Sequence, residues 1–502
     1  MNTRTKNAIR NIKFGLINKI ILLLFPFFIR TTIIKTLGSE YVGLSSLFTS
    51  ILLMLNLAEL GISDAIIYCM YKPIAEKDEK VICALMNLFK KLYRIIGCII
   101  FILGILLLPF LKHLIKGSYP ANINIYLLYV LYLINTVLTY FLFAYKNALL
   151  IVKQRIDINS KIQSIISIIQ YTIQIIVIRL FKNFYLYVII QILCVCLNNI
   201  FTFIYTKKNY PKYICYGEVN ETIKKDVKKR VKGLLIQKIC GTTRNSLDSI
   251  FISLYLGLNL VAMYSNYYSI MYSIISIMSI ITSSITAGIG NSVVTESEEK
   301  NYKDMNKINF IYMWLSGFCT ICLLCLFQPF MKLWVGKEYI FPFSIVILFC
   351  VYFYSLKLGD IRSIYSTVNG LWYENRYRAV IESILNIILN IVLGKYFGVY
   401  GIILGTLISL LLINFVYGSQ IVFKYYFKNQ NISEYFYKHG LYSLATLINS
   451  IITYYLCSFV SFSGIKELIL KGIICAFIPN IIYLIIYFKT KIFKESLSII
   501  KK

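Results

Sequence analysis

The sequence predicts an all-α polytopic membrane protein of about fourteen transmembrane helices, arranged as two parallel six-helix repeats followed by two C-terminal helices. The 502 residues are 58% hydrophobic and only 15% charged, with a mean hydropathy of +0.70, which is beyond the range of a soluble domain. Apolar runs of about twenty residues recur along the whole chain, each long enough to cross a bilayer. A weak internal repeat divides these runs into two sets of six.

The first apolar run follows a basic N-terminal segment, as a secretory signal does. It is longer than the usual apolar core of a signal and no small-residue cleavage pattern follows it, so we expect a retained first span. Glutamines and asparagines interrupt the fifth and eleventh candidates. The fourteen candidate spans lie at residues 14–36, 42–70, 92–114, 123–145, 161–180, 184–206, 234–256, 260–289, 308–334, 342–368, 379–397, 399–423, 441–461 and 467–488.

The lysines and arginines predict the orientation of these spans. Counted over alternate loops, about 36 of the 52 basic residues fall on the side of the N-terminus and about 10 on the other side. The basic side is expected to be cytoplasmic, with both termini on it. Topology, together with attraction to anionic lipid, therefore accounts for the net charge of +30, and we expect no nucleic-acid partner.

The connections between the spans are too short to hold a catalytic domain. The longest, at 207–233, is a basic loop, and the chain has no phosphate-binding loop of the Walker type. These features argue against a glycosyltransferase, a polymerase or an ATP-driven pump, and we expect a protein that is not an enzyme.

No metal or organic cofactor is expected either. The histidines, His113 and His439, have no metal-ligand company in the sequence. The run Cys319-x-x-Cys322-x-x-Cys325 resembles an iron–sulfur motif, but it lies inside a candidate span with no fourth cysteine nearby. We interpret these cysteines as core residues.

Four pairs of segments align when the chain is shifted against itself by about 219 positions. The aligned segments are 37–42 with 256–261, 109–112 with 329–332, 162–165 with 381–384 and, at a shift of 220, 76–80 with 296–300. Since the repeat unit holds an even number of spans, both halves are expected to have the same orientation, with a central site between two bundles. The resulting divisions are an N-terminal bundle at 1–206, a basic cytoplasmic linker at 207–233, a C-terminal bundle at 234–423, and two extra helices with a cytoplasmic tail at 424–502.

Charged residues inside the spans are the candidate functional residues, because an arginine or aspartate facing lipid at mid-helix costs ~2.5 to 3.5 kcal/mol. The basic candidates for substrate binding are Lys19, Arg30, Lys238, Arg244, Lys357 and Arg362. The acidic candidates, for coupling to H⁺ or Na⁺ or for charge balance, are Glu59, Asp64, Asp248 and Asp360.

Other interpretations of these charges stay open. Arg30 would be a simple anchor if it lay near the outer interface, and Lys238 would be one at the cytoplasmic face. Arg244 and Asp248 are one helical turn apart and would neutralise each other as a structural pair. Lys357, Asp360 and Arg362 form the densest charge cluster, which favours function, whereas Glu382 near the edge of its span is expected to be solvated or to cap a helix.

Several stretches resemble a known family. They are 30–44, which ends in Leu-Gly-Ser-Glu-Tyr-Val-Gly-Leu, then Ala-Glu-Leu-Gly-Ile at 58–62, Tyr-Lys-Pro-Ile-Ala at 71–75, and the glycine-rich segment 398–406. They resemble polysaccharide-biosynthesis flippases of the Wzx type, in the multidrug/oligosaccharidyl-lipid/polysaccharide exporter superfamily. The resemblance covers spans 1 to 12, but the first-half counterpart of 398–406, around 183–193, lacks the glycines.

The resemblance implies a protein of the bacterial cytoplasmic membrane that flips a polyprenyl-pyrophosphate-linked oligosaccharide by alternating access, for O-antigen, capsule or exopolysaccharide assembly. Arg30 would then be a ligand of the head group, and the partners would be membrane lipid and the polysaccharide polymerase and assembly proteins. Some members of the family are coupled to cations. The alternatives are a cell-wall lipid-precursor flippase and a cation-coupled drug antiporter of the same superfamily, and, further off, a glycan polymerase or ligase.

Overall fold

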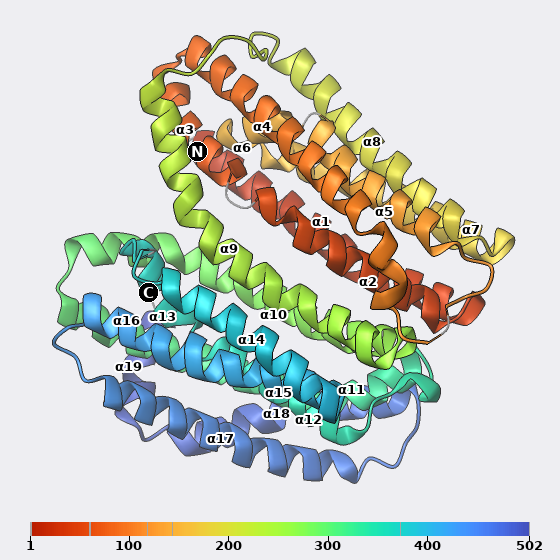
Figure 1. The fold of residues 1–502 in the computed structure, drawn as a ribbon. Coiled ribbons are helices and arrows are strands. Elements are labelled where there is room, and N and C mark those ends of the chain that lie inside the picture. The colour runs from red at the N-terminus through yellow and green to blue at the C-terminus, as the bar shows by residue number, and fades with distance from the viewer. Residues whose placement is uncertain (1–2, 60–61, 118, 143, 372, 501–502) are drawn as a thin grey trace. The chain divides into compact units, whose positions relative to one another are not determined.

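The described part of the chain is built from helices. The computed structural model describes residues 3–59, 62–117, 119–142, 144–371 and 373–500, which form helices and connecting loops without a β strand (Figure 1). Ten of these helices are long and apolar enough to cross a membrane, or up to twelve if each of two bent pairs counts as one span. The predicted all-α polytopic class is confirmed, but the count of fourteen is not. The second predicted span contains a shorter apolar helix, Ser39–Leu55, whereas the seventh lies inside the long helix Glu221–Leu256, of which the described apolar part is Ser246–Leu256.

The chain forms two compact units, Met1–Ala262 (unit 1) and Met263–Lys502 (unit 2). This boundary lies beyond the predicted linker at 207–233, because the helix that follows the linker packs against the second and third helices of unit 1. The predicted division rests on the repeat and not on packing, so it stays a prediction.

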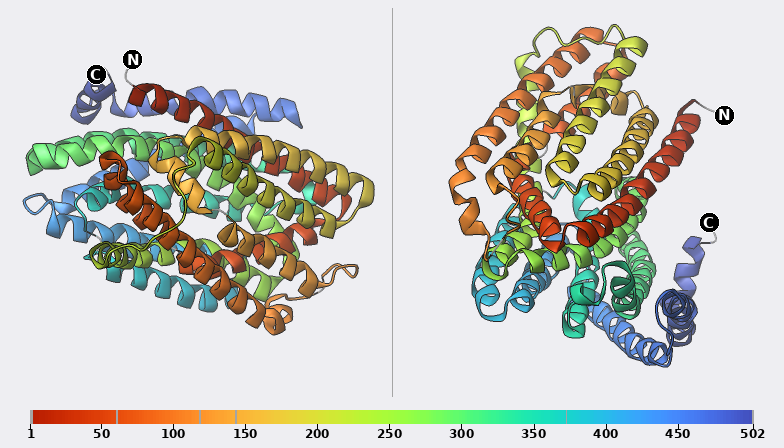
Figure 2. Two further views of the ribbon diagram at one scale, coloured as in Figure 1. Left: turned by 90° about the horizontal axis from the view of Figure 1, so that it is seen from above. Right: turned by 90° about the vertical axis from the view of Figure 1, so that its right-hand side faces the viewer.

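The helices of unit 1 pack side by side in pairs. α1 lies along α7, α7 along α8, and α4 along α5 (Figure 2). Two of its spans are bent, by 59° after α4 and by 50° between α5 and α6. The helices are α1 (Thr3–Thr36), α2 (Ser39–Leu55), α3 (Ile62–Glu76), α4 (Glu79–Leu106), α5 (Ile125–Phe141), α6 (Ala144–Val152), α7 (Ile156–Phe181), α8 (Phe184–Asn209) and α9 (Glu221–Leu256), with 3₁₀ segments η1 (Asn56–Glu59) and η2 (Leu108–Leu114).

Unit 2 contains most of α10 and all later helices. The two C-terminal helices α17 and α18 pack on α11, around a core that includes Phe310, Tyr442 and Tyr483. The elements are α10 (Leu258–Thr295), α11 (Glu298–Trp334), η3 (Lys337–Tyr339), α12 (Phe343–Lys357), α13 (Asp360–Val368), α14 (Arg376–Phe397), α15 (Val399–Ser409), the π-helix η4 (Leu410–Tyr417), α16 (Gly418–Tyr425), α17 (Ile432–Ser458), α18 (Ile465–Tyr487) and α19 (Lys491–Ile500).

The internal repeat is visible in the local backbone. Gly38 precedes α2 with φ 117° and ψ 164°, and Gly257, 219 positions later, precedes α10 with φ 93° and ψ 173°. Residues with a side chain avoid this region of the backbone, which is open to glycine. The same glycine-dependent link therefore joins the first two helices of each half.

A later helix of each half also begins at matched positions, α4 at Glu79 and α11 at Glu298. Asp78 caps α4 by accepting a hydrogen bond from the Val81 amide at 3.1 Å, and Ser297 caps α11 by accepting one from the Lys300 amide at 3.3 Å. These caps are 219 positions apart. The sequence alignment of 76–80 with 296–300 has a shift of 220, one residue longer than the shift between the caps. It differs because it matched charged residues and not the capping residues.

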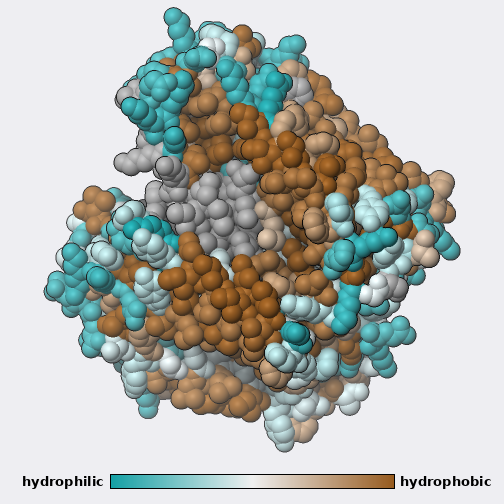
Figure 3. Space-filling view, viewed as in Figure 1, coloured by the Kyte–Doolittle hydropathy of each residue, from teal (hydrophilic) through white to brown (hydrophobic). Residues whose placement is uncertain are grey.

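The surface suits a lipid environment. Large apolar side chains on α18 are exposed, for instance Phe477 at 64% and Ile485 at 68%. On the face drawn in Figure 3, apolar side chains cover wide areas of each unit and hydrophilic ones gather towards helix ends and loops. Apolar patches of this extent are typical of membrane contact.

Candidate functional site

A polar groove of about 410 Å³ lies in unit 2 between α10 and the α12–α13 segment. Four of its lining hydroxyls recur on one face of α10, at spacings of three or four residues. The opposite wall carries a lysine, an aspartate and two further hydroxyls. The lining residues are Ser279, Thr282, Ser283, Thr286, Lys357, Asp360, Ser363, Ile364 and Thr367.

A break in the predicted tenth span places the charges of this groove. α12 ends at Lys357 and α13 begins at Asp360, with Gly359 at the junction. The aspartate therefore lies in the first turn of α13, where the helix dipole favours a negative charge. Lys357 and Asp360 reach the same groove because they are one turn apart across this break.

The charges at the groove compensate each other. Lys357 Nζ lies 2.7 Å from Asp360 Oδ2, and the Tyr312 hydroxyl donates to the same oxygen at 2.5 Å. The lysine side chain is 6% exposed and that of the aspartate 31%, so the carboxylate faces the groove more than the ammonium does. The groove thus presents a locally neutral ion pair among hydroxyl groups.

The hydroxyl groups on the α10 wall donate their hydrogens to carbonyl oxygens of their own helix, which leaves their oxygens as acceptors. The Thr282 hydroxyl donates to the Ser279 carbonyl at 3.1 Å, Ser283 to Ile280 at 2.9 Å, and Thr286 to the Thr282 carbonyl at 2.8 Å. A hydroxyl has one hydrogen and two lone pairs, so the oxygens keep acceptor capacity towards the groove. Such a wall suits a ligand rich in hydrogen-bond donors, such as a saccharide.

Unit 1 holds a related carboxylate. Glu59, at the end of η1, accepts hydrogen bonds from the hydroxyl of Tyr93 on α4 and, at 2.6 Å, from that of Tyr140 on α5. The Glu59 side chain is half-buried. The structure thus places this predicted ion-coupling candidate between two helices and clamps it with tyrosines.

Arg362 lies away from the groove, buried at 2% exposure. Its Nη2 donates to the Asn414 carbonyl oxygen at 2.9 Å, inside the π-helix η4. Two glycines leave room for the guanidinium, since a Cβ at Gly359 or Gly418 would lie 2.6 or 2.7 Å from its nitrogens. The carbonyls of a π-helical turn deviate from the regular α ladder, and Arg362 supplies a donor to one of them. The geometry gives Arg362 a packing role in unit 2, and substrate contact by it stays a prediction.

The same network corrects the expectation for Glu382. Its carboxylate is 6% exposed, accepts from Arg378 Nη1 at 2.9 Å and from the Asn414 amide at 3.1 Å, and so is neither solvated nor a cap. The charge near the span edge is buried because α14 packs on η4. Arg378 one turn earlier compensates it.

The remaining candidates are distributed over unit 1. Arg30 on α1 is partly buried and lies close enough to Tyr187 of α8 for an electrostatic interaction. Lys19, also on α1, is half-buried, and Asp248 on α9 is buried at 1% exposure. The side chains of Lys238, Arg244 and Asp64 lie outside the described part of the structure, so the predicted Arg244–Asp248 pair stays a prediction.

Two kinds of functional candidate were not found in the sequence. The tyrosines that hold the carboxylates are uncharged and are lost among the 42 tyrosines of the chain. The hydroxyl face of α10 had a signal, the consecutive Thr282-Ser283-Ser284 inside an otherwise apolar span. Both kinds of group are uncharged, whereas a charge inside an apolar span is a strong signal.

These helices and the groove define a multi-pass membrane protein of a fold class that solved structures also show. Neither a comparison with protein-family profiles nor a search among curated proteins finds a match. Among solved structures, "Lipid II flippase MurJ, inward closed conformation" matches with a TM-score of 0.66 at 18% identity, over 95% of this chain and 99% of that one.

Two transporters of the MOP superfamily match as well. An inward-facing multidrug resistance MATE family transporter has a TM-score of 0.63 at 13% identity, over 82% of this chain and 97% of that one. A transporter from Pyrococcus furiosus, described as having a binding pocket of reverse polarity, has a TM-score of 0.53 at 14% identity, over 83% and 96% of the two chains. The chain therefore has the fold shared by the MurJ flippase and these transporters.

Proposed function

We propose that this protein is a flippase for a polyprenyl-pyrophosphate-linked oligosaccharide, acting in the bacterial cytoplasmic membrane during surface polysaccharide assembly. The observation that carries the proposal is the hydroxyl-lined groove of unit 2. Its acceptor oxygens suit sugar hydroxyls, and the fold is that of proteins that move substrates across membranes. We infer transport by alternating access, with no enzymatic step.

The neutral ion pair supports a saccharide over a cationic drug. A cation would be attracted by a carboxylate of uncompensated charge, whereas the charge of Asp360 is already compensated by Lys357. A saccharide can use the hydroxyls of α10 without disturbing this pair. The drug-antiporter alternative is therefore the weaker one.

The pyrophosphate requires basic groups elsewhere, since the lysine of the groove is neutralised. Arg30 and Lys19 on α1 remain the candidates in the described part of unit 1, with Lys238 and Arg244 on α9 as further candidates from the sequence. An arginine can bind two phosphate oxygens at once. Coupling to H⁺ or Na⁺ would use Glu59, whose carboxylate is held by two hydroxyl donors.

An apolar groove of about 430 Å³ in unit 2 offers lining for a lipid tail. It lies between α11, α18 and α19 and includes Trp314, Phe318 and Phe493. A lipid tail inside a membrane is not removed from water, so its gain would come from van der Waals packing against the aromatic walls. A polyprenyl chain fits this chemistry better than a soluble drug does.

A cell-wall lipid-precursor flippase stays the second candidate, because the likeness to the MurJ structure covers 95% of this chain. The two substrates share a polyprenyl pyrophosphate and differ in the head group. Depletion of the cell's own precursor flippase separates them. If this protein rescues the growth of the depleted strain, the second candidate is favoured. If it does not rescue growth but restores surface glycan in a mutant that lacks its glycan flippase, the first candidate is favoured.

The decisive experiment is flipping of a lipid-linked oligosaccharide in proteoliposomes. The variant Thr282→Val/Ser283→Ala/Thr286→Val removes three acceptors, and at ~1 kcal/mol for each hydrogen bond we expect the flipping rate to fall by at least about tenfold. The matched control is Ser269→Ala/Ser273→Ala, which removes α10 hydroxyls outside the groove. Equal rates for both variants would contradict the role of the groove.

The cellular test is a deletion strain. It should accumulate the lipid-linked glycan on the cytoplasmic leaflet, and Arg30→Ala should weaken export while insertion into the membrane is kept. Normal surface glycan without a trapped intermediate would end the flippase proposal.

A further inference from the structure

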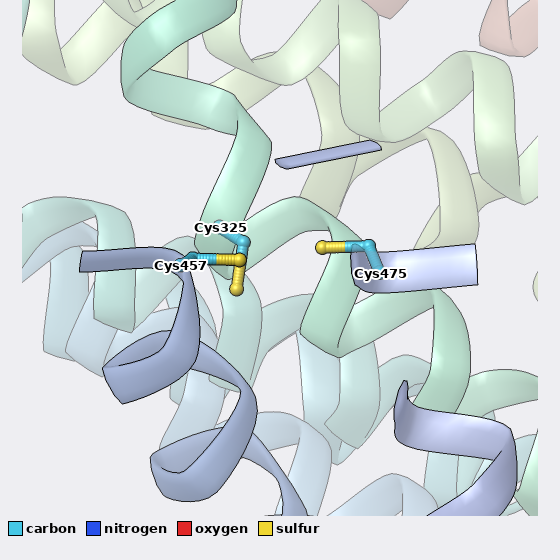
Figure 4. Close-up of side chains that lie close together, drawn as sticks. All are labelled: Cys325, Cys457 and Cys475. Carbon is cyan, nitrogen blue, oxygen red and sulfur yellow. The ribbon is translucent and has the colours of Figure 1, made fainter. Parts of the chain in front are cut away.

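Three thiols from three helices meet inside unit 2. They belong to Cys325 on α11, Cys457 on α17 and Cys475 on α18, and their sulfur atoms all lie within 4.8 Å of one another. The side chains are buried, at 3%, 1% and 1% exposure. Figure 4 shows Cys325 and Cys457 next to each other, with the Cys475 sulfur directed towards them.

The spacing of the sulfur atoms suits a single metal ion. Three thiolates at about 2.3 Å from a central ion, arranged in a plane, lie roughly 4 Å apart. The observed upper limit of 4.8 Å needs only a small contraction. Because each cysteine has one side-chain torsion before its sulfur, such a contraction does not require the helices to move.

The ligand set selects the ion. Sulfur ligands favour soft ions, whereas Na⁺, Mg²⁺ and Ca²⁺ prefer oxygen. Structural zinc sites are nearly always four-coordinate, and the cluster contains three ligands with no fourth His, Cys, Asp or Glu among the residues described. Cu(I) is soft and is satisfied by thiolates, so it fits a three-sulfur site.

Burial limits the charge that the site can carry. Cu(I) with three thiolates would have a net charge of −2, which is costly in an apolar interior. Cu(I) with two thiolates and one thiol has a net charge of −1, and its formation releases two protons to solvent without any transfer of electrons. Lys471, one turn before Cys475 on α18, interacts electrostatically with Cys457 but is paired with Glu467 at 2.7 Å, so the site keeps its charge low through its own protonation.

We propose that Cys325, Cys457 and Cys475 form a three-coordinate Cu(I) site. The site joins both C-terminal helices to α11, the third span of the second repeat. It departs from the expectation of no metal, which was based on the isolated histidines and on the cysteine spacing within α11. Cys319 and Cys322, the other cysteines of that run, are not members of the cluster.

The test uses the full-length protein in detergent, reduced and kept anaerobic, with Cu(I) supplied from a chromogenic chelator. We expect one copper ion per chain to be withdrawn from the chelator. X-ray absorption should show only sulfur neighbours at about 2.3 Å. Cys475→Ala should weaken retention of copper by at least about a hundredfold, beyond the 10–100-fold typical of losing an outer-shell partner.

The matched control is Cys319→Ala/Cys322→Ala on the same helix, which should bind copper as the unaltered protein does. Cys475→Ser is compared by size-exclusion profile and thermal unfolding in the absence of copper, so that a folding defect is separated from ligand loss. Failure of the unaltered protein to take copper from the chelator would overturn the proposal. Nitrogen or oxygen neighbours in the absorption spectrum, or equal copper binding by Cys475→Ala, would overturn it as well.

Discussion

The carboxylates of Glu59 and Asp360 are both held by tyrosine hydroxyls, but they come from different places in the two halves of the chain. Tyr93 and Tyr312 occupy the same repeat position, 219 residues apart, and each donates to the carboxylate of its own unit. Glu59 comes from the segment after α2, whereas Asp360 comes from the break between α12 and α13. A tyrosine thus stands at the matched position of each half, while its acceptor comes from a different segment.

The two carboxylates also differ in their further partners. Asp360 pairs with an ammonium group, whereas Glu59 receives a second tyrosine hydroxyl, that of Tyr140. A carboxylate held by hydroxyls keeps its negative charge uncompensated by these partners, whereas one paired with lysine is neutralised. Under the proposed function, we therefore expect coupling-ion chemistry in unit 1 and neutral saccharide contact in unit 2.

The largest expected effect comes from breaking the ion pair of unit 2. Lys357→Met leaves the Asp360 carboxylate without its cation, at a cost of roughly 2 kcal/mol. This value is below the ~3–5 kcal/mol of a fully buried pair because the Asp360 side chain is 31% exposed. Thermal unfolding in detergent measures the loss of stability.

The double variant Lys357→Met/Asp360→Asn is the control for this prediction, because it removes both charges. We expect it to regain most of the lost stability and most of the flipping rate. Stability that returns without flipping would mean that the charges themselves contact the substrate, and the assignment of neutral contact to unit 2 would be wrong.

A smaller effect is expected at Arg362, the other basic residue of this segment. Arg362→Met should leave the Asn414 carbonyl without its donor and lower the free energy of unfolding by ~1 kcal/mol, the typical net value of one hydrogen bond. Flipping per folded molecule should be nearly unchanged. A variant of normal stability that does not flip would instead restore Arg362 as a substrate ligand.

The smallest effects test the tyrosines of the two halves. Tyr93→Phe and Tyr312→Phe each remove one hydrogen bond to a carboxylate. Because a second donor stays on each carboxylate, we expect a loss below ~1 kcal/mol, less than the ~1.5–3 kcal/mol of an isolated hydrogen bond to a charged group. Double-mutant cycles with Glu59→Gln and Asp360→Asn measure the two coupling energies. We expect Tyr93→Phe to change the dependence of flipping on H⁺ or Na⁺, and Tyr312→Phe to leave it unaltered. The opposite result would reverse the assignment of the units.

The sequence predicted the fold class well and the site only in part. Long apolar runs identify membrane helices directly, and the repeat located the paired links at Gly38 and Gly257. Asp360 and Lys357 were found because charges inside an apolar span are conspicuous. Whether a guanidinium such as that of Arg362 faces a groove or a carbonyl depends on a π-helix 48 residues later, at Leu410–Tyr417, which apolar periodicity does not reveal.

Other features depend on contacts between distant segments. Cys325 meets cysteines that follow it by more than 130 positions, and no local spacing pattern includes them. The hydroxyl face of α10 is a local pattern, yet serine and threonine are common in membrane helices and carry a weak signal. Polar but uncharged groups are therefore the part of such a site that a single sequence reveals least.

The paired glycines before α2 and α10 also restrict what random mutation can do to this gene. Any change of codon 38 or 257 to another amino acid adds a Cβ where the backbone has φ of 117° or 93°. At Gly257 that Cβ would also lie 2.9 Å from the Lys116 carbonyl oxygen, whereas at Gly38 no atom lies within 4 Å. In a saturation library selected for surface glycan, both codons should be depleted of substitutions, and codon 257 the more strongly of the two.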